Sequence, residues 1–316
     1  MAHYLVGRLI SAVATLFVGA VVSFAVFHLL PGNVAETIAG LGASKAQIAS
    51  IARSLGLDNG IVVQFFHWLS LLAHGKLGES YVSFVPVTTL LAQRLPVTLE
   101  LIGTSFIVIL VTAIPLSLGA VRPGSLLDRL AMFWSILWLS IPVFWVGLVL
   151  VEVVAVKWRL LPASGFVSFL SSPLQALRYT LLPSITLGFY LSAIVTQYLR
   201  QALLGIMQED YILAARARGL SEREVVLYHA VKPALIPFFT VLGVLIGTAV
   251  GGTVLIEAVF NLGGFGQMLV SAVIARDYYV VQDSILIIIS AVIIMNLIVD
   301  ILYVVVDPRV RYSDGG

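Results

Sequence analysis

Long apolar stretches separated by polar segments dominate this chain. Six of them reach the length of about 20 residues that a helix needs to cross a bilayer, because a helix rises 1.5 Å per residue. They are residues 9–30, 97–121, 130–156, 181–204, 235–259 and 284–306. The first is too long for a cleaved secretory signal, and no small-residue cleavage site follows it. The pattern therefore predicts an all-α integral membrane protein with six transmembrane helices.

Composition supports a membrane location. Of the 316 residues, 60% are hydrophobic and only 11% are charged, and the mean hydropathy is +1.05. A soluble domain is about one quarter charged, so too little polar surface remains for a water-soluble globule. The net charge of +2 without a basic block argues against nucleic-acid binding. The absence of cysteine excludes disulfides, thiol catalysis and thiolate metal sites.

The distribution of lysine and arginine predicts the orientation, because these residues are enriched in short cytoplasmic loops. With the N-terminus inside, ten lie in inner segments and four in short outer loops; four more lie in the first outer segment, which is too long for the rule. The inner ten are Arg8, Arg122, Arg129, Arg200, Arg216, Arg218, Arg223, Lys232, Arg309 and Arg311, and the outer four are Lys157, Arg159, Arg178 and Arg276. Both termini are therefore predicted to be cytoplasmic.

The first outer segment, residues 31–96, contains signals for two helices. Ser44 and Gln47 form a capping-box pattern that begins a short amphipathic helix, which ends at Gly56. Residues 61–73 follow with aromatic and aliphatic side chains at helical spacing, which is typical of a helix at the membrane interface. The segment either packs as a cap over the helices or contacts an external partner.

The predicted cytoplasmic loop, residues 205–233, contains the start and stop signals of two short helices joined at Gly219. Ser221 and Glu224 form a second capping box, and Pro233 is expected to stop the second helix. Alanines on the first helix keep one side thin enough for another protein to approach closely. The alternative is an ordinary charged loop.

Nucleotide hydrolysis by this chain can be excluded from its lysines. A phosphate-binding loop needs a lysine followed by serine or threonine. Lys45, Lys76, Lys157 and Lys232 are followed by Ala, Leu, Trp and Pro. We therefore expect no enzymatic activity and no cofactor in this chain, and any energy from ATP must enter through another polypeptide.

Glycines, carboxylates and prolines interrupt the apolar spans. Gly243, Gly247 and Gly251 repeat every four residues on one face of the fifth span. Such a face favours close packing, either against another helix of this chain or, as a helix-packing seam, against a partner subunit. Glu152 and Asp300 lie near the ends of their predicted spans. Each carboxylate either reaches the membrane interface or forms a structural pair, or else it contacts the cargo. Pro115, Pro142 and Pro183 either fix helix direction or shape a gate. The histidines lack carboxylate partners, so no metal site is expected.

Several short strings, in order along most of the chain, resemble one transporter family. Ala214, Ala215 and Gly219 have the Ala-Ala…Gly spacing of bacterial ABC importer permeases, although Leu213 stands where their glutamate is found. The rest resembles the dipeptide/oligopeptide/nickel importer permeases, of the first of their two paired types. The strings are Leu29-Leu30-Pro31-Gly32-Asn33, Leu55-Gly56-Leu57-Asp58, Gly75-Lys76-Leu77-Gly78-Glu79-Ser80, Arg94-Leu95-Pro96-Val97-Thr98-Leu99-Glu100, Ser140-Ile141-Pro142-Val143-Phe144-Trp145, Glu257-Ala258-Val259-Phe260, Arg276-Asp277-Tyr278-Tyr279 and Asp307-Pro308-Arg309-Val310-Arg311. Val34 and Tyr279 stand where proline is expected.

The resemblance implies a type I importer fold in the bacterial cytoplasmic membrane. A homologous second permease, two ATPase subunits that bind ATP and Mg²⁺, and an external substrate-binding protein would be its partners. The resemblance also divides the chain into four parts. These are the N-terminal tail with the first span (residues 1–30), an extracytoplasmic segment (31–96), a permease core (97–306) and a cytoplasmic tail (307–316). The loop residues expected to dock on an ATPase are Asp210, Tyr211, Ala214, Ala215, Arg216, Arg218, Gly219, Leu220, Ser221 and Glu224.

The resemblance also suggests an external gate and a cargo. Glu257, Phe260, Gly264 and Gly266 follow the fifth span and are expected to shape that gate, because glycines there permit a tight re-entrant turn. Short peptides are the expected cargo, and nickel complexes or another small solute are the alternatives. An ion-driven secondary transporter is the competing class, but it should show paired broken helices and buried carboxylates near the midplane. A membrane scaffold without transport activity is a third class.

Overall fold

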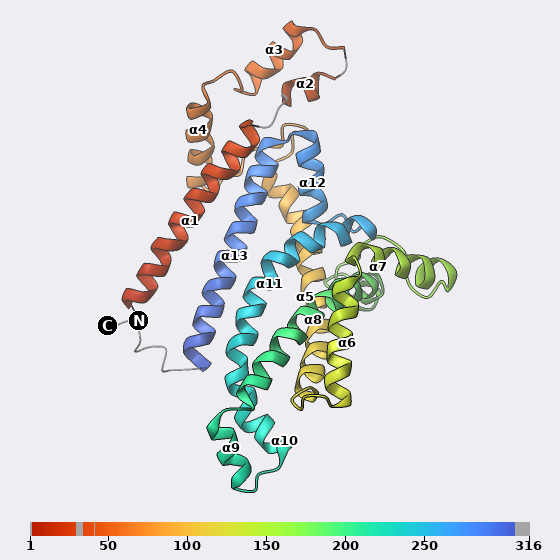
Figure 1. The fold of residues 1–316 in the computed structure, drawn as a ribbon. Coiled ribbons are helices and arrows are strands. Elements are labelled where there is room, and N and C mark those ends of the chain that lie inside the picture. The colour runs from red at the N-terminus through yellow and green to blue at the C-terminus, as the bar shows by residue number, and fades with distance from the viewer. Residues whose placement is uncertain (1, 30–33, 41, 307–316) are drawn as a thin grey trace. The chain divides into compact units, whose positions relative to one another are not determined.

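The computed structural model describes residues 2–29, 34–40 and 42–306, and these residues are almost entirely helical (Figure 1). Within them no strand forms beyond a single bridge between Glu79 and Pro86. The elements are α1 (Ala2–Leu29), α2 (Val34–Ala39), α3 (Lys45–Ser54), α4 (Ile61–Ala73), α5 (Val87–Gly119), α6 (Leu126–Ser140), α7 (Val143–Leu150), η1 (Val151–Lys157), α8 (Pro173–Ile206), α9 (Asp210–Ala217), α10 (Glu222–Glu224), η2 (Val225–Ala230), α11 (Val231–Val259), α12 (Phe265–Ala275) and α13 (Tyr278–Val306). The tail 307–316 lies outside the described residues. Apolar α-helices are the expected solution for a bilayer, because they satisfy every backbone hydrogen bond internally.

The chain forms two compact units. Unit 1 comprises residues 1–96 and 263–293, and unit 2 comprises residues 97–262 and 294–316.

Unit 1 contains the two helices predicted in the first polar segment. Ser44 begins α3 with the capping box to Gln47, as predicted. The apolar stretch 61–73 forms α4, also as predicted, and its two faces differ sharply. Trp68 is 1% exposed and packs with Ala20 and Phe24 of α1, whereas Phe66 is 61% exposed. One face of α4 therefore belongs to the core of unit 1 and the other remains open.

The core of unit 2 is centred on α8, which packs against both α6 and α11. Small residues bring its backbone close to α5. A Cβ atom placed on Gly188 would lie 2.6 Å from Val108 Cβ and 3.0 Å from the Ser105 carbonyl oxygen. No side chain fits at that position without moving a neighbour, so glycine sets the separation of these two helices.

Most of the predicted spans correspond to long apolar helices. Among the described residues, four helices are long and apolar enough to cross a membrane by themselves: Val87–Gly119, Pro173–Ile206, Glu222–Leu245 and Tyr278–Leu302. In α1 the described apolar stretch, Ile10–Ala25, is shorter. Helices α5, α8 and α13 begin 6–10 residues before the predicted starts at 97, 181 and 284.

The third predicted span, residues 130–156, is not one continuous helix. It consists of α6 and the α7–η1 segment, which meet at an angle of 91°. Ile141 has extended backbone angles, φ −102° and ψ 129°, and ends α6. The residue before a proline is sterically biased away from the helical region, and the Pro142 ring cannot continue the hydrogen-bond ladder. A broken span or a re-entrant loop therefore replaces the straight helix that hydropathy predicted.

The prediction that Pro233 stops the second loop helix is wrong. Helical structure continues from α10 through the π-helical turn η2 into α11, and Pro233 lies in the first turn of α11. The wider π-helical turn changes the hydrogen-bond register, so a proline just after it need not break the ladder. The second loop helix is therefore continuous with a span.

Candidate functional site

The predicted hinge at Gly219 forms a sharp turn between α9 and α10, at one end of unit 2. We call residues 207–224 the elbow. Gly219 has a φ of +84°, and its amide donates to the Arg216 carbonyl at 2.9 Å. Apart from Gly219 and its two neighbours in the chain, no atom of the described residues lies within 4 Å of the position that a Cβ would take. Glycine is required here by the left-handed backbone and not by lack of space.

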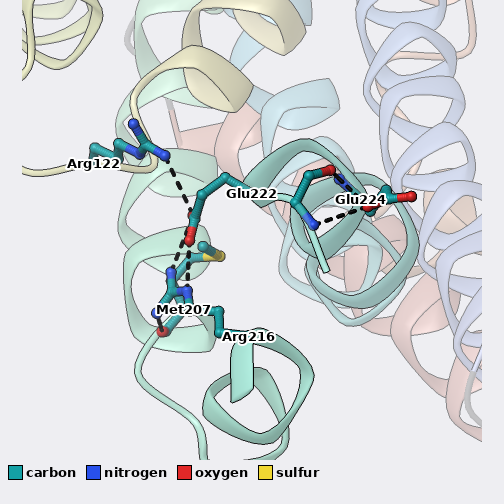
Figure 2. A network of polar contacts seen from close by, with 6 residues as sticks. Arg122, Met207, Arg216, Glu222 and Glu224 are labelled. Carbon is teal, nitrogen blue, oxygen red and sulfur yellow. Dashed lines mark hydrogen bonds and ion pairs between the residues drawn. The ribbon is translucent and has the colours of Figure 1, made fainter. Parts of the chain in front are cut away.

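The second half of the elbow begins with the predicted capping box. The Ser221 hydroxyl accepts from the Glu224 amide, while the Ser221 amide donates to the Glu224 carboxylate at 2.9 Å (Figure 2). These bonds satisfy backbone donors at the helix start that otherwise have no partner. The box therefore fixes the direction in which α10 leaves the turn.

Glu222 joins the two helices of the elbow to a distant loop. Its carboxylate accepts from Arg216 of α9 at 2.8 and 3.3 Å. Arg122, in the loop between α5 and α6, lies 3.9 Å from the same carboxylate (Figure 2). Glu222 thus lies between two guanidinium groups that come from separate segments. The sequence did not indicate Glu222 or Arg122 as site residues, because no local pattern shows that residues 100 positions apart meet.

The elbow contains both buried and exposed apolar residues. Ile212 and Ala215 are fully buried in the core of unit 2. Tyr211 and Leu213 are 43% and 51% exposed. Ala214, Arg218 and Gly219 are also exposed. Leu213 occupies the position of the family's glutamate, so an apolar side chain is presented there. Exposed apolar groups beside charged ones are typical of an interaction surface.

The helix-packing seam predicted at Gly243, Gly247 and Gly251 is only partly packed within this chain. A Cβ on Gly243 would lie 3.1 Å from Val299 of α13, so that glycine allows an internal contact. Gly247 and Gly251 are exposed. Among the described residues, and apart from its own helical turn, no atom lies within 4 Å of a Cβ placed on Gly251. A seam against a partner at these two positions stays a prediction.

The residues of the predicted gate lie in both units. In unit 2, Glu257 is fully buried and accepts from the Thr98 hydroxyl at 2.5 Å, and Phe260 is 1% exposed. In unit 1, Gly264 begins α12 and Gly266 is buried in its first turn. Gly263, which directly precedes Gly264 and was not among the predicted residues, has a φ of +70°. The gate stays a prediction.

An ion pair near the start of α6 was not predicted. Arg200, one of the ten basic residues counted in the inner segments, donates through its Nε to the Asp128 carboxylate at 2.5 Å. Asp128 also accepts from the Gly124 amide at 2.8 Å. The side chains are 19% and 3% exposed, so the pair is largely removed from solvent. It joins α6 to α8.

Glu152 pairs with Lys157 at 3.5 Å, and both side chains are more than half exposed. Within the described part of the chain, no three His, Asp or Glu side chains gather as a metal site requires.

Comparison with known proteins identifies the class to which this helical membrane bundle belongs. The model of the family "Binding-protein-dependent transport system inner membrane component" matches residues 109–312, and the model of its N-terminal part matches residues 1–102. The chain therefore belongs to this family of multi-pass inner membrane permeases, as the resemblance of its strings indicated.

Individual relatives match from end to end. A probable peptide ABC transporter permease protein of Sinorhizobium fredii is 34% identical over 313 residues, 99% of this chain and 100% of the relative. A putative peptide transport system permease protein of Brucella abortus is 37% identical over 314 residues, again 99% and 100%. The glutathione transport system permease protein GsiC of Escherichia coli is 36% identical over the same lengths. These relatives are transport subunits and not enzymes.

Proposed function

We propose that this chain is a permease subunit of an ATP-driven importer of short peptides. With a homologous second permease it would form the translocation path, and an external binding protein would deliver the cargo. Two ATPase subunits would bind ATP and Mg²⁺ and dock on the elbow. The observation that carries the proposal is the end-to-end similarity to peptide permeases.

The elbow supports the docking step physically. Its exposed Tyr211 and Leu213 offer apolar contact area, and Gly219 fixes the angle between its helices. Because η2 and α11 continue directly from α10, a displacement of the elbow would be transmitted to a membrane span through continuous helix. The elbow would then face the cytoplasm, as the distribution of lysine and arginine also predicts.

The cargo is proposed from the relatives alone. Two are named for peptide transport and one for glutathione, which is itself a tripeptide. Peptides share an amide backbone that a binding protein can recognise independently of side chains. Glutathione is therefore a cargo to be tested beside ordinary dipeptides and tripeptides.

Reconstitution provides the test. The permease, the partner permease and ATPases encoded beside it and the binding protein are placed in proteoliposomes with ATP inside, and uptake of labelled di- and tripeptides, glutathione and a nickel chelate is measured. We expect peptide uptake that requires ATP and every partner. Uptake by this chain without ATPases would overturn the proposal, and so would ATP-dependent uptake of the nickel chelate alone.

The contact between Arg122 and Glu222 gives a prediction for coupling. Glu222→Arg places a third cation beside Arg122 and Arg216, so we expect uptake per molecule of ATP hydrolysed to fall several-fold. Stability should change by less than about 1 kcal/mol, because the side chains of Arg122 and Glu222 are 67% and 36% exposed and solvent screens their charges. The double variant Arg122→Glu/Glu222→Arg should recover part of the loss. If both variants assembled normally and the double variant recovered none of the loss, Arg122 would have no role in coupling.

A further inference from the structure

A cavity of about 370 Å³ in unit 1 has a lining rich in aromatic residues. Phe24, Trp68, Tyr81, Tyr278 and Tyr279 contribute rings from α1, α4, the loop before α5 and the start of α13. Phe24 stacks on Trp68 with ring centroids 6.0 Å apart, and Tyr81 lies 4.8 Å from Tyr279. Polar side chains, together with Leu55, Gly56 and Val63, complete the lining. Among the described residues that line the cavity, none is lysine or arginine.

Two buried carboxylates contact residues that line this cavity. Asp283 is 1% exposed, and its Oδ1 accepts from Trp68 Nε1 at 2.9 Å. Its Oδ2 is buried and accepts no hydrogen bond within the described structure. Asp277 is 4% exposed and accepts from the Ser80 hydroxyl and, at 3.0 Å, from the Tyr81 amide. No ion pair in the described part of the chain includes either carboxylate.

This arrangement lacks positive charge. A buried carboxylate is stable when a cation or several donors compensate it, and Asp283 has one donor for two oxygens. A negative field in a space of low dielectric favours a cation strongly. Aromatic faces attract cations through their quadrupole, tryptophan most of all. Both features favour the same chemical class of ligand.

We propose that this cavity binds an ammonium group. Primary and quaternary amines fit the lining, and the volume admits a head group of the size of choline. A zwitterionic peptide fits poorly because, among the described residues, no lysine or arginine lines the cavity to meet its carboxylate. Asn59 and His67 line the cavity and are exposed, so a ligand can enter beside them. The ammonium group can belong to a soluble amine or to the head group of a phospholipid such as phosphatidylethanolamine.

Binding to the purified full-length chain tests the proposal. Choline and its neutral isostere 3,3-dimethyl-1-butanol are titrated at pH 8, with calorimetry as the readout. We expect choline to bind saturably and at least about tenfold more tightly than the isostere. Asp283→Asn, which keeps an acceptor for Trp68, should weaken choline binding by at least about tenfold. Glu36→Gln, which removes an exposed carboxylate of unit 1, should leave it unchanged.

A second pair of variants keeps the proposal testable if Asp283→Asn fails to fold. Tyr81 lies in a loop, so Tyr81→Leu removes a ring with little risk to a helix, while Tyr81→Phe keeps the ring. Choline affinity should fall in the first and persist in the second. Nanodiscs of phosphatidylglycerol with and without phosphatidylethanolamine then separate the two sources, because an occupying lipid should compete with choline. Equal affinities for choline and the isostere, or unchanged binding in both Asp283→Asn and Tyr81→Leu, would overturn the proposal.

Discussion

A Gly219→Val variant is expected to lose most peptide uptake while it still inserts into the membrane. A β-branched residue at a φ of +84° is strained by about 1–2 kcal/mol or more, which the elbow can relieve only by changing the angle between α9 and α10. At about 1.4 kcal/mol per factor of ten, docking of the ATPases should weaken roughly tenfold. Uptake and permease-stimulated ATP hydrolysis in proteoliposomes measure the effect.

The control for Gly219 follows from the open space around it. No atom lies within 4 Å of a Cβ at this position, so a side chain as such is tolerated. Asparagine enters the left-handed region far more readily than other side chains. Gly219→Asn should therefore retain much more uptake than Gly219→Val, although the asparagine side chain is the longer of the two. Equal loss in both would show that the surface and not the backbone angle matters, and normal uptake in both would remove the elbow from the mechanism.

Local sequence patterns predicted the polar segments well. Both capping boxes, at Ser44 and Ser221, form as their spacing indicated. The turn at Gly219 and the helix Ile61–Ala73 also follow from neighbouring residues alone. Such features depend on interactions over three or four positions, so a single sequence contains all the information that they need.

The errors arose where hydropathy was used without backbone stereochemistry. The apolar stretch 130–156 contains Ile141-Pro142, and the restriction on the residue before proline could have indicated the 91° break. The π-helical turn η2 has no comparable sequence signal, so the continuation of the helix past Pro233 could not be foreseen. Hydropathy measures which solvent a segment prefers and not whether it is straight.

Contacts between distant residues were also inaccessible. Trp68 meets Asp283 across 215 positions, and Arg122 meets Glu222 across 100. Each residue alone was compatible with an interfacial or surface location. Pairing of this kind depends on how helices pack, which one sequence without homologues does not reveal. The parts of the candidate site that were missed are therefore its long-range polar contacts.

The second large effect is expected at the ion pair between Asp128 and Arg200. Asp128→Ala leaves a guanidinium group that is only 19% exposed without its partner, and also removes the acceptor for the Gly124 amide. Breaking one side of a buried pair typically costs about 3–5 kcal/mol. We expect the melting temperature of the detergent-solubilised protein to fall by roughly 5–10 °C. Thermal unfolding followed by tryptophan fluorescence measures it.

Two further variants separate the buried charge from the loss of contacts. Glu152→Ala breaks an exposed ion pair of 3.5 Å and should cost less than about 1 kcal/mol. The double variant Asp128→Leu/Arg200→Leu removes both charges, so it should be more stable than Asp128→Ala even though it loses more hydrogen bonds. That ordering follows only if an unpaired cation is the main penalty. If the double variant were less stable than the single one, the contribution of the pair to stability would lie in its hydrogen bonds. Arg200 would then hold α8 against α6 mainly by directed hydrogen bonding and not by charge neutralisation.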